Sequence, residues 1–92
     1  MSESDDHEDE AFAETALIQA IENQIEAGEP AATRATLNKL TLVGYEREEI
    51  VQLMALVLAH EVKAMLREDR AFDGEAYEQA LRALPALPAE TD

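Results

Sequence analysis

The sequence predicts an all-α protein, a compact antiparallel bundle of about four helices. Apolar residues recur at helical spacing in four segments, and glycine or proline stands between most of these segments. Val, Ile and Thr never alternate with polar residues over the length of a strand. Short connections favour antiparallel neighbours, which is the basis for the bundle. A bundle of three longer helices is the alternative.

The first helix is predicted from about Glu10 to Ala27, and Gly28 ends it just past the last turn. Small residues flank its apolar stripe and allow a neighbouring helix to approach closely. The stripe consists of Leu17, Ile18, Ile21 and Ile25.

The second helix is predicted from Pro30 to about Val43, with Glu29 at the cap. Proline suits the first helical position, because the N–H that it lacks would have no partner within the helix. Gly44 ends this helix. The residues that we expect it to bury are Ala32, Leu37 and Leu40.

The third helix is predicted from Glu46 to Asp69, with Glu46 near the cap and Glu49 three positions further on. At about 100° per residue, its apolar residues form an arc too wide for one neighbouring helix to cover. Leu56 lies outside this arc. The arc consists of Ile50, Leu53, Met54, Val57, Leu58, Val62, Met65 and Leu66. Such a helix is wrapped by the other helices of its own chain or completed by a partner.

The fourth helix is predicted from Gly74 to about Leu84. Asp73 is a strong capping residue, and Phe72 is placed to contact Tyr77 across the start of the helix. Its apolar positions recur at helical spacing and are expected to cover one side of the third helix. These positions are Ala76, Tyr77, Ala80, Leu81 and Leu84.

The two ends of the chain differ from the middle. Residues 1–9 are predicted to form a disordered acidic tail, since like charges without basic residues disfavour packing. Residues 10–85 are the predicted helical domain, and residues 86–92, which follow Pro85 and include Pro88, are predicted to be an extended C-terminal tail.

Charge and composition narrow the classes of function. The chain has 21 acidic and 7 basic residues, which give a net charge of −14. Phosphate backbones and anionic membranes both repel such a chain, so we expect no nucleic-acid partner and no membrane partner. Cysteine is absent, and the acidic start does not resemble a signal peptide. We therefore expect a cytoplasmic protein of bacterial type.

The sequence offers little for catalysis, and we predict that the protein is not an enzyme and holds no cofactor. No third group completes a triad with His7 or His60. Glu61 falls near the centre of the apolar arc, where it is expected to reach water or to pair with Arg34 or Lys39, a functional carboxylate being the alternative. Metal binding has only weak candidates, without the spacing of known sites. These candidates are Glu22, Glu48, His60 and Glu61.

One part of the chain resembles a small bacterial helical family of unknown function. The likeness rests on Ile21-Glu22-Asn23-Gln24-Ile25, then Gly28-Glu29-Pro30, Leu37, Leu40 and Gly44, and it covers about Leu17 to Leu66. Members of the family carry a His-Glu-Ala-Ile-His segment where the long helix opens, and often a further histidine upstream. Here the segment is Glu48-Glu49-Ile50-Val51-Gln52, so only Glu22 carries over as a potential metal ligand.

The leading functional hypothesis is a non-enzymatic protein-interaction or regulatory module, which binds a protein partner or forms a homodimer. It depends on the wide apolar arc of the third helix and on the outlying Leu56. The residues expected to carry the contact are Leu53, Leu56, Val57 and His60. The alternatives are a degenerate metal-binding domain and an acidic mimic of nucleic acid that binds a basic protein.

Overall fold

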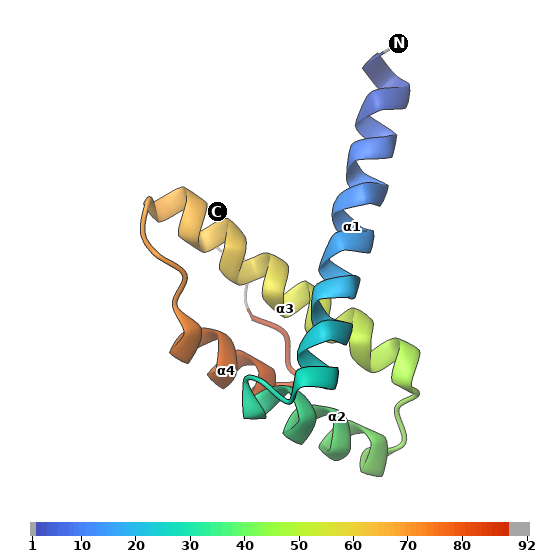
Figure 1. Cartoon of the computed structure of the whole chain (residues 1–92), viewed down its shortest axis with the longest axis vertical. Coiled ribbons are helices and arrows are strands. Elements are labelled where there is room, and N and C mark those ends of the chain that lie inside the picture. The colour runs from blue at the N-terminus through green and yellow to red at the C-terminus, as the bar shows by residue number, and fades with distance from the viewer. Residues whose placement is uncertain (1, 89–92) are drawn as a thin grey trace.

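The structure is a computed structural model that describes the backbone of residues 2–88 and the side chains of residues 13–88. These residues form four helices and no strand: α1 (Ser2–Ala27), α2 (Ala31–Val43), α3 (Arg47–Glu68) and α4 (Gly74–Ala83) (Figure 1). The predicted all-α bundle of four helices is confirmed, and the alternative of three helices is wrong.

α1 begins at Ser2, whereas the sequence placed its start at about Glu10. Acidic side chains are favoured at the positive end of the helix dipole, and Glu and Ala have high helix propensity, so the helix extends through the acidic segment. The predicted division into segments 1–9, 10–85 and 86–92 stays a prediction. Met1 and residues 89–92 lie outside the described residues.

Gly28 ends α1 with a φ of +73°, and its N–H donates to the carbonyl oxygen of Gln24 at 2.8 Å. The Arg34 side chain covers this end from α2, because its Nε donates to the carbonyl oxygen of Ile25 and its Nη2 to that of Glu26, both at 2.8 Å. The last carbonyl groups of α1 therefore have partners across the α1–α2 turn.

α2 is capped by Pro30 rather than by Glu29, a shift of one residue from the prediction. Its C-terminal cap is Gly44, whose N–H donates to the carbonyl oxygens of Leu40 and Thr41. The expected burial of Ala32 and Leu40 is confirmed. Two polar residues, Thr33 and Thr36, are buried beside them.

α3 starts after Glu46, whose backbone N–H donates to Glu49 Oε1 at 3.1 Å. Glu46 and Glu49, which the sequence places at the cap and three positions further on, thus form a capping box. α3 ends at Glu68, and the backbone of the next residue, Asp69, turns to a φ of 54°. The predicted bounds of the long helix are confirmed to within one residue.

α4 is capped by Asp73, whose Oδ1 accepts a hydrogen bond from the Ala76 N–H at 3.1 Å. The rings of Phe72 and Tyr77 meet edge to face with centroids 5.5 Å apart, as the sequence predicts for this helix start. Tyr77 and Leu81 are the buried residues of α4, and Leu84 just beyond it is also buried.

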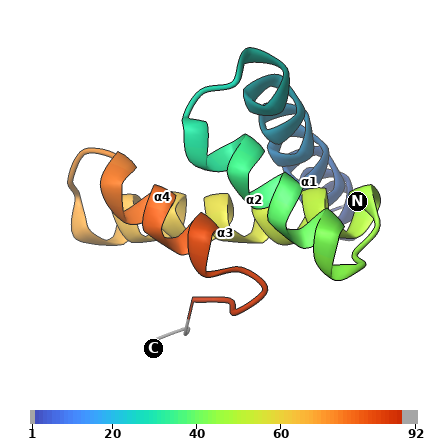
Figure 2. The same cartoon turned by 90° about the horizontal axis from the view of Figure 1, so that it is seen from below.

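α3 contacts all three other helices, and so does α2. α2 and α4 lie side by side against α3 (Figure 2), and α1 crosses α3 so that the N-terminal part of α1 projects beyond the bundle (Figure 1). The core lies where these helices meet. Its fully buried large side chains include Ile21, Leu40, Ile50, Met54, Val57, Leu81 and Leu84.

The buried face of α3 differs from the predicted arc. Val51 and Ala55 are buried, whereas Leu66 is 70% exposed. Val51 and Ala55 are buried because α1 crosses α3 there. Leu66 lies in the last turn of α3, away from that crossing (Figure 1). The prediction that Leu66 is covered is therefore wrong.

None of the helices within residues 2–88 combines the length and the apolarity that a bilayer crossing requires.

Candidate docking groove between α1 and α3

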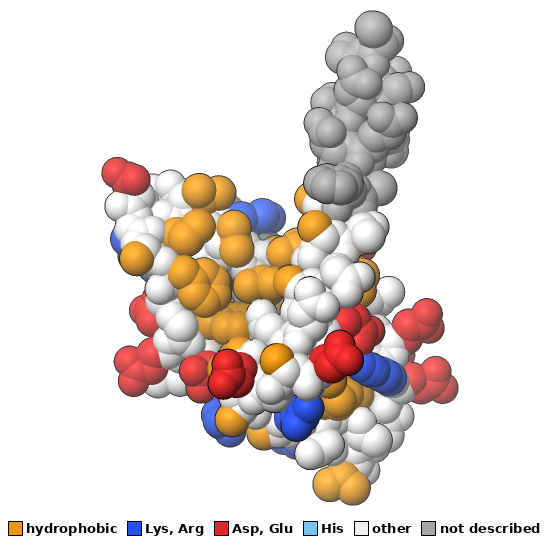
Figure 3. All heavy atoms as spheres, viewed as in Figure 1, with side chains coloured by type: hydrophobic (Ala, Val, Ile, Leu, Met, Phe, Trp, Pro, Cys, Tyr) orange, Lys and Arg blue, Asp and Glu red, His pale blue; other side chains and the backbone are white. Residues whose placement is uncertain are grey.

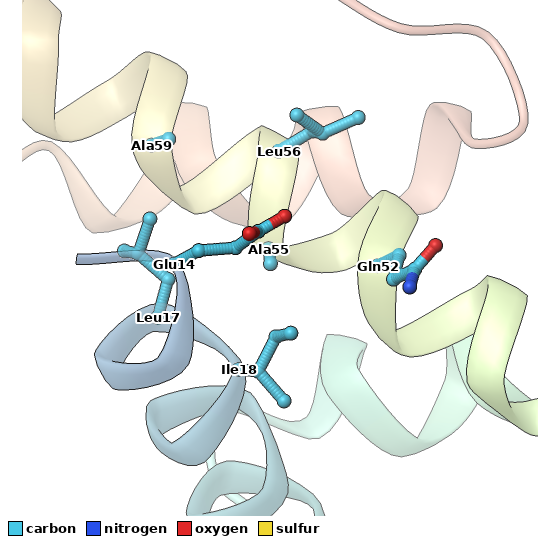
Figure 4. Close-up of a pocket in the computed structure, with 7 residues that line it drawn as sticks. All are labelled: Glu14, Leu17, Ile18, Gln52, Ala55, Leu56 and Ala59. Atoms are coloured by element: carbon cyan, nitrogen blue, oxygen red, sulfur yellow. The ribbon is translucent and has the colours of Figure 1, made fainter. Parts of the chain in front are cut away.

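A groove of about 190 Å³ lies in the angle between α1 and α3. Figure 4 shows its side chains, of which three come from α1 and four from α3. Most of the lining is apolar, and two polar residues stand among it. The lining consists of Glu14, Leu17, Ile18, Gln52, Ala55, Leu56 and Ala59.

Leu56 is the exposed apolar residue of this groove, with 55% of its surface accessible. Ala55 next to it is buried, and Leu17 and Ile18 on α1 are half-buried against the core. One turn further along α3, Ala59 is half-buried. The groove therefore has an apolar floor and one leucine that is still half accessible to water after folding.

A second hollow of about 410 Å³ continues the groove toward the start of α3. Both hollows share Ile18 and Gln52 in their linings. The residues that the second hollow adds are Glu22, Arg47, Glu48 and Val51. Together the two form one trough along the α1–α3 seam.

The polar residues of the trough are mainly acidic. Glu14, Glu22 and Glu48 contribute three carboxylates, and Arg47 contributes the one guanidinium among the lining side chains. Arg47 Nη2 lies 2.6 Å from Glu22 Oε1, so this positive charge is already engaged by α1. In Figure 4 the Glu14 carboxylate extends from α1 toward α3. The trough is an apolar surface with a negative edge.

The four residues predicted to carry the protein contact lie in different environments. Leu56 lies in the groove, whereas Val57 is 1% exposed and belongs to the core. Leu53 and His60 are half-buried and are not among the lining residues. Sequence reasoning missed the α1 side of the groove, where Leu17 and Ile18 were assigned to the buried stripe. Their incomplete burial depends on where α1 crosses α3, which the stripe itself does not specify.

The metal-ligand candidates do not converge. Glu22 pairs with Arg47, and Glu61 pairs with Arg70, whose Nη1 lies 3.1 Å from Glu61 Oε2. Among the residues whose side chains are described, no three His, Asp or Glu side chains are placed to hold a metal ion together.

Glu61 is 6% exposed, and its partner is Arg70 in the α3–α4 connection, so the expected pairing with Arg34 or Lys39 is wrong. Lys39 donates instead to the carbonyl oxygen of Arg82, and Arg34 covers the end of α1. Arg70 also lies 2.6 Å from Glu68, and this hydrogen bond is the main reason that the pKa of the exposed Glu68 carboxyl is lowered. The arginine therefore ties the start of the connection to the last turns of α3.

A polar junction of Gln24, Thr33, Thr36 and Tyr77 lies away from the groove, where α1, α2 and α4 meet. Gln24 Oε1 accepts hydrogen bonds from Tyr77 Oη at 2.8 Å and from Thr33 Oγ1 at 3.2 Å. Thr36 Oγ1 donates to the carbonyl oxygen of Leu81 at 3.0 Å. Burial raises the pKa of Tyr77 to about 12, although the hydrogen bond to Gln24 acts in the opposite direction. The raised pKa of Tyr77 therefore results from its burial in the fold, and Tyr77 does not line the groove.

Apolar side chains also gather on the face shown in Figure 3, between α1, α3 and α4. Exposed apolar surface is therefore not confined to the groove. The groove is hollowed between two helices and has carboxylates at its edge.

Comparison with protein-family models, with curated proteins and with solved structures gives no match for this chain. The resemblance of the segment from Leu17 to Leu66 to a helical family stays a prediction, and the function has to be argued from the groove itself.

Proposed function

We propose that the protein is a non-enzymatic interaction module that docks another protein in the α1–α3 groove. The observation that carries this proposal is the half-exposed Leu56 beside the half-buried Leu17 and Ile18. A cytoplasmic location belongs to the same proposal.

The physical basis is the burial of apolar surface that folding leaves accessible. Full burial of a leucine side chain contributes about 1.5–3 kcal/mol, and Leu56 has about half of that burial still to gain. The walls of the groove are two packed helices, so a partner meets a surface that needs little ordering. An amphipathic helix laid into a groove is a common form of peptide recognition.

A pair of matched variants tests the proposal. Leu56→Glu places a charge in the groove, and Leu42→Glu places the same charge at a leucine of α2 that is 88% exposed and outside the lining. Both variants should keep the helical circular dichroism and the thermal midpoint of the unchanged chain. A partner isolated on the unchanged chain and then purified should bind it and Leu42→Glu one to one.

The same purified partner should fail to bind Leu56→Glu. Equal binding to both variants would show that the partner does not contact the groove. Unfolding of Leu56→Glu alone would mean that Leu56 is a core residue, and the proposal would then fail.

Acidic mimicry of nucleic acid is a second candidate, favoured by the net charge of −14. It predicts binding to a basic protein that weakens steeply with salt and does not depend on Leu56. Binding that persists in high salt and is lost in Leu56→Glu would exclude it.

A further inference from the structure

We infer that the occupant of the α1–α3 groove is a basic amphipathic helix of another protein, not a second copy of this chain. This inference rests on the proposed docking function and adds the chemistry of the partner. It comes from the length of the trough, from the charge along it and from the charge of the whole chain.

The trough has the length of a short helix. On α3 its lining extends from Arg47 to Ala59. Twelve steps at 1.5 Å per residue span about 18 Å, which equals a little more than three turns of a partner helix. A partner that presents apolar residues at positions i, i+3, i+4 and i+7 would place about three side chains along this floor.

Charge selects a basic helix. At the edge of the trough Glu22 and Arg47 pair with each other, so the carboxylates of Glu14 and Glu48 supply the remaining charge of the described lining. Lysine or arginine flanking the apolar stripe of a docked helix would therefore face the carboxylates of Glu14 and Glu48.

The same charges disfavour a second copy. Each chain carries a net charge of −14, and a two-fold contact through the groove would bring the Glu14 and Glu48 carboxylates of both copies together. No unpaired cation in the described lining is available to offset them, because Arg47 already contacts Glu22. The negative potential of this chain attracts a basic partner and repels a second copy.

Titration with designed peptides tests the inference on the full chain. The first probe is a helix-forming peptide of about 18 residues with leucine at helical spacing and lysine on both flanks. Two matched peptides carry glutamine or glutamate in place of every lysine. Isothermal calorimetry measures each against the unchanged chain, Leu56→Ser, Leu42→Ser and the double variant Glu14→Gln/Glu48→Gln.

We expect one lysine peptide to bind per chain, with affinity reduced about tenfold by Leu56→Ser and unchanged by Leu42→Ser. The glutamine peptide should bind more weakly and the glutamate peptide not at all. The double variant should bind the lysine peptide more weakly, and this binding should depend less on salt concentration.

The outcomes that overturn the inference also separate it from the proposed function. Equal affinity for the lysine and glutamine peptides, with loss in Leu56→Ser, would keep docking but remove the basic partner. A dimer in light scattering that Leu56→Ser dissociates would keep docking and make a second copy the occupant. If the lysine peptide binds Leu56→Ser as tightly as the unchanged chain, both proposals are overturned, because charge alone would then account for the binding. Absence of peptide binding to a monomeric chain would overturn the inference.

Discussion

The two contacts that α1 makes differ in kind. Near its C-terminal end, α1 meets α2 and α4 through the polar junction, where Gln24 receives hydrogen bonds from both neighbours. Toward its middle, α1 meets α3 through Leu17 and Ile18, and the described bond between these two helices is the ion pair of Glu22 and Arg47 at one end of the trough. Hydrogen bonds specify a single arrangement, whereas an apolar seam can accept further apolar groups. Under the proposed function, the C-terminal end of α1 serves the fold and its middle serves binding.

Deleting a core side chain beneath the junction should have the largest effect. Leu81 is fully buried on α4, so Leu81→Ala should lower the free energy of unfolding by about 2–5 kcal/mol. Leu42→Ala, at an 88% exposed leucine, should change it by less than about 0.5 kcal/mol. Urea denaturation measures both. A loss below about 1 kcal/mol for Leu81→Ala would show that α4 is not part of the core.

The turn between α1 and α2 should tolerate little change. Gly28 has a φ of +73°, and an added Cβ would lie 3.1 Å from Arg34 Cζ and Nη1. Gly28→Ala should therefore destabilise the protein by about 1–2 kcal/mol. Gly74→Ala is the control, since no atom lies within 4 Å of the Cβ that it would add. Equal effects of the two substitutions on the urea midpoint would contradict the described turn.

Loss of the Tyr77 hydroxyl should have a smaller effect. Tyr77→Phe removes the hydrogen bond to Gln24, which is 2.8 Å long, and should cost about 1 kcal/mol. Leu81→Ala and Tyr77→Phe thus compare the loss of apolar packing with the loss of one hydrogen bond in the same region.

The same tyrosine gives a pH dependence with a definite sign. Burial raises the pKa of Tyr77 from 10.0 to about 12, so the folded state keeps the proton where the unfolded state has lost it. The stability that this contributes is fully present below pH 10 and is lost as pH rises to about 12. Unfolding free energies across this range should fall more steeply for the unchanged chain and for Tyr45→Phe than for Tyr77→Phe. Identical slopes in all three proteins would contradict the burial of Tyr77.

The smallest effect on stability is expected in the groove. Leu56 is 55% exposed, so Leu56→Ser should change the free energy of unfolding by less than about 0.5 kcal/mol. A loss of 2 kcal/mol or more, comparable to that of a core leucine, would erase the distinction between the two contacts of α1.

Periodicity and caps were enough to predict the fold. The number of helices, the Asp73 cap and the contact between Phe72 and Tyr77 all follow from local signals. The partner of Glu61 could not be predicted in the same way, because Arg70 lies in a connection whose path has no period.

The groove was predictable only in part. Leu56 departs from the apolar arc of α3, and that departure is visible in the sequence. Val51 and Ala55 are buried where α1 crosses α3, and the position of this crossing is a property of the whole fold. One-dimensional patterns do not contain that geometry.

The central claim is that the α1–α3 groove binds a partner while the polar junction stabilises the fold. The most direct test maps the backbone amide chemical shifts of the full chain as the lysine peptide is added. We predict that the changes concentrate at Leu17, Ile18, Ala55, Leu56 and Ala59 and leave Thr33 and Tyr77 of the polar junction unmoved. Changes centred on the apolar face between α3 and α4, or spread evenly over the acidic residues, would contradict the account.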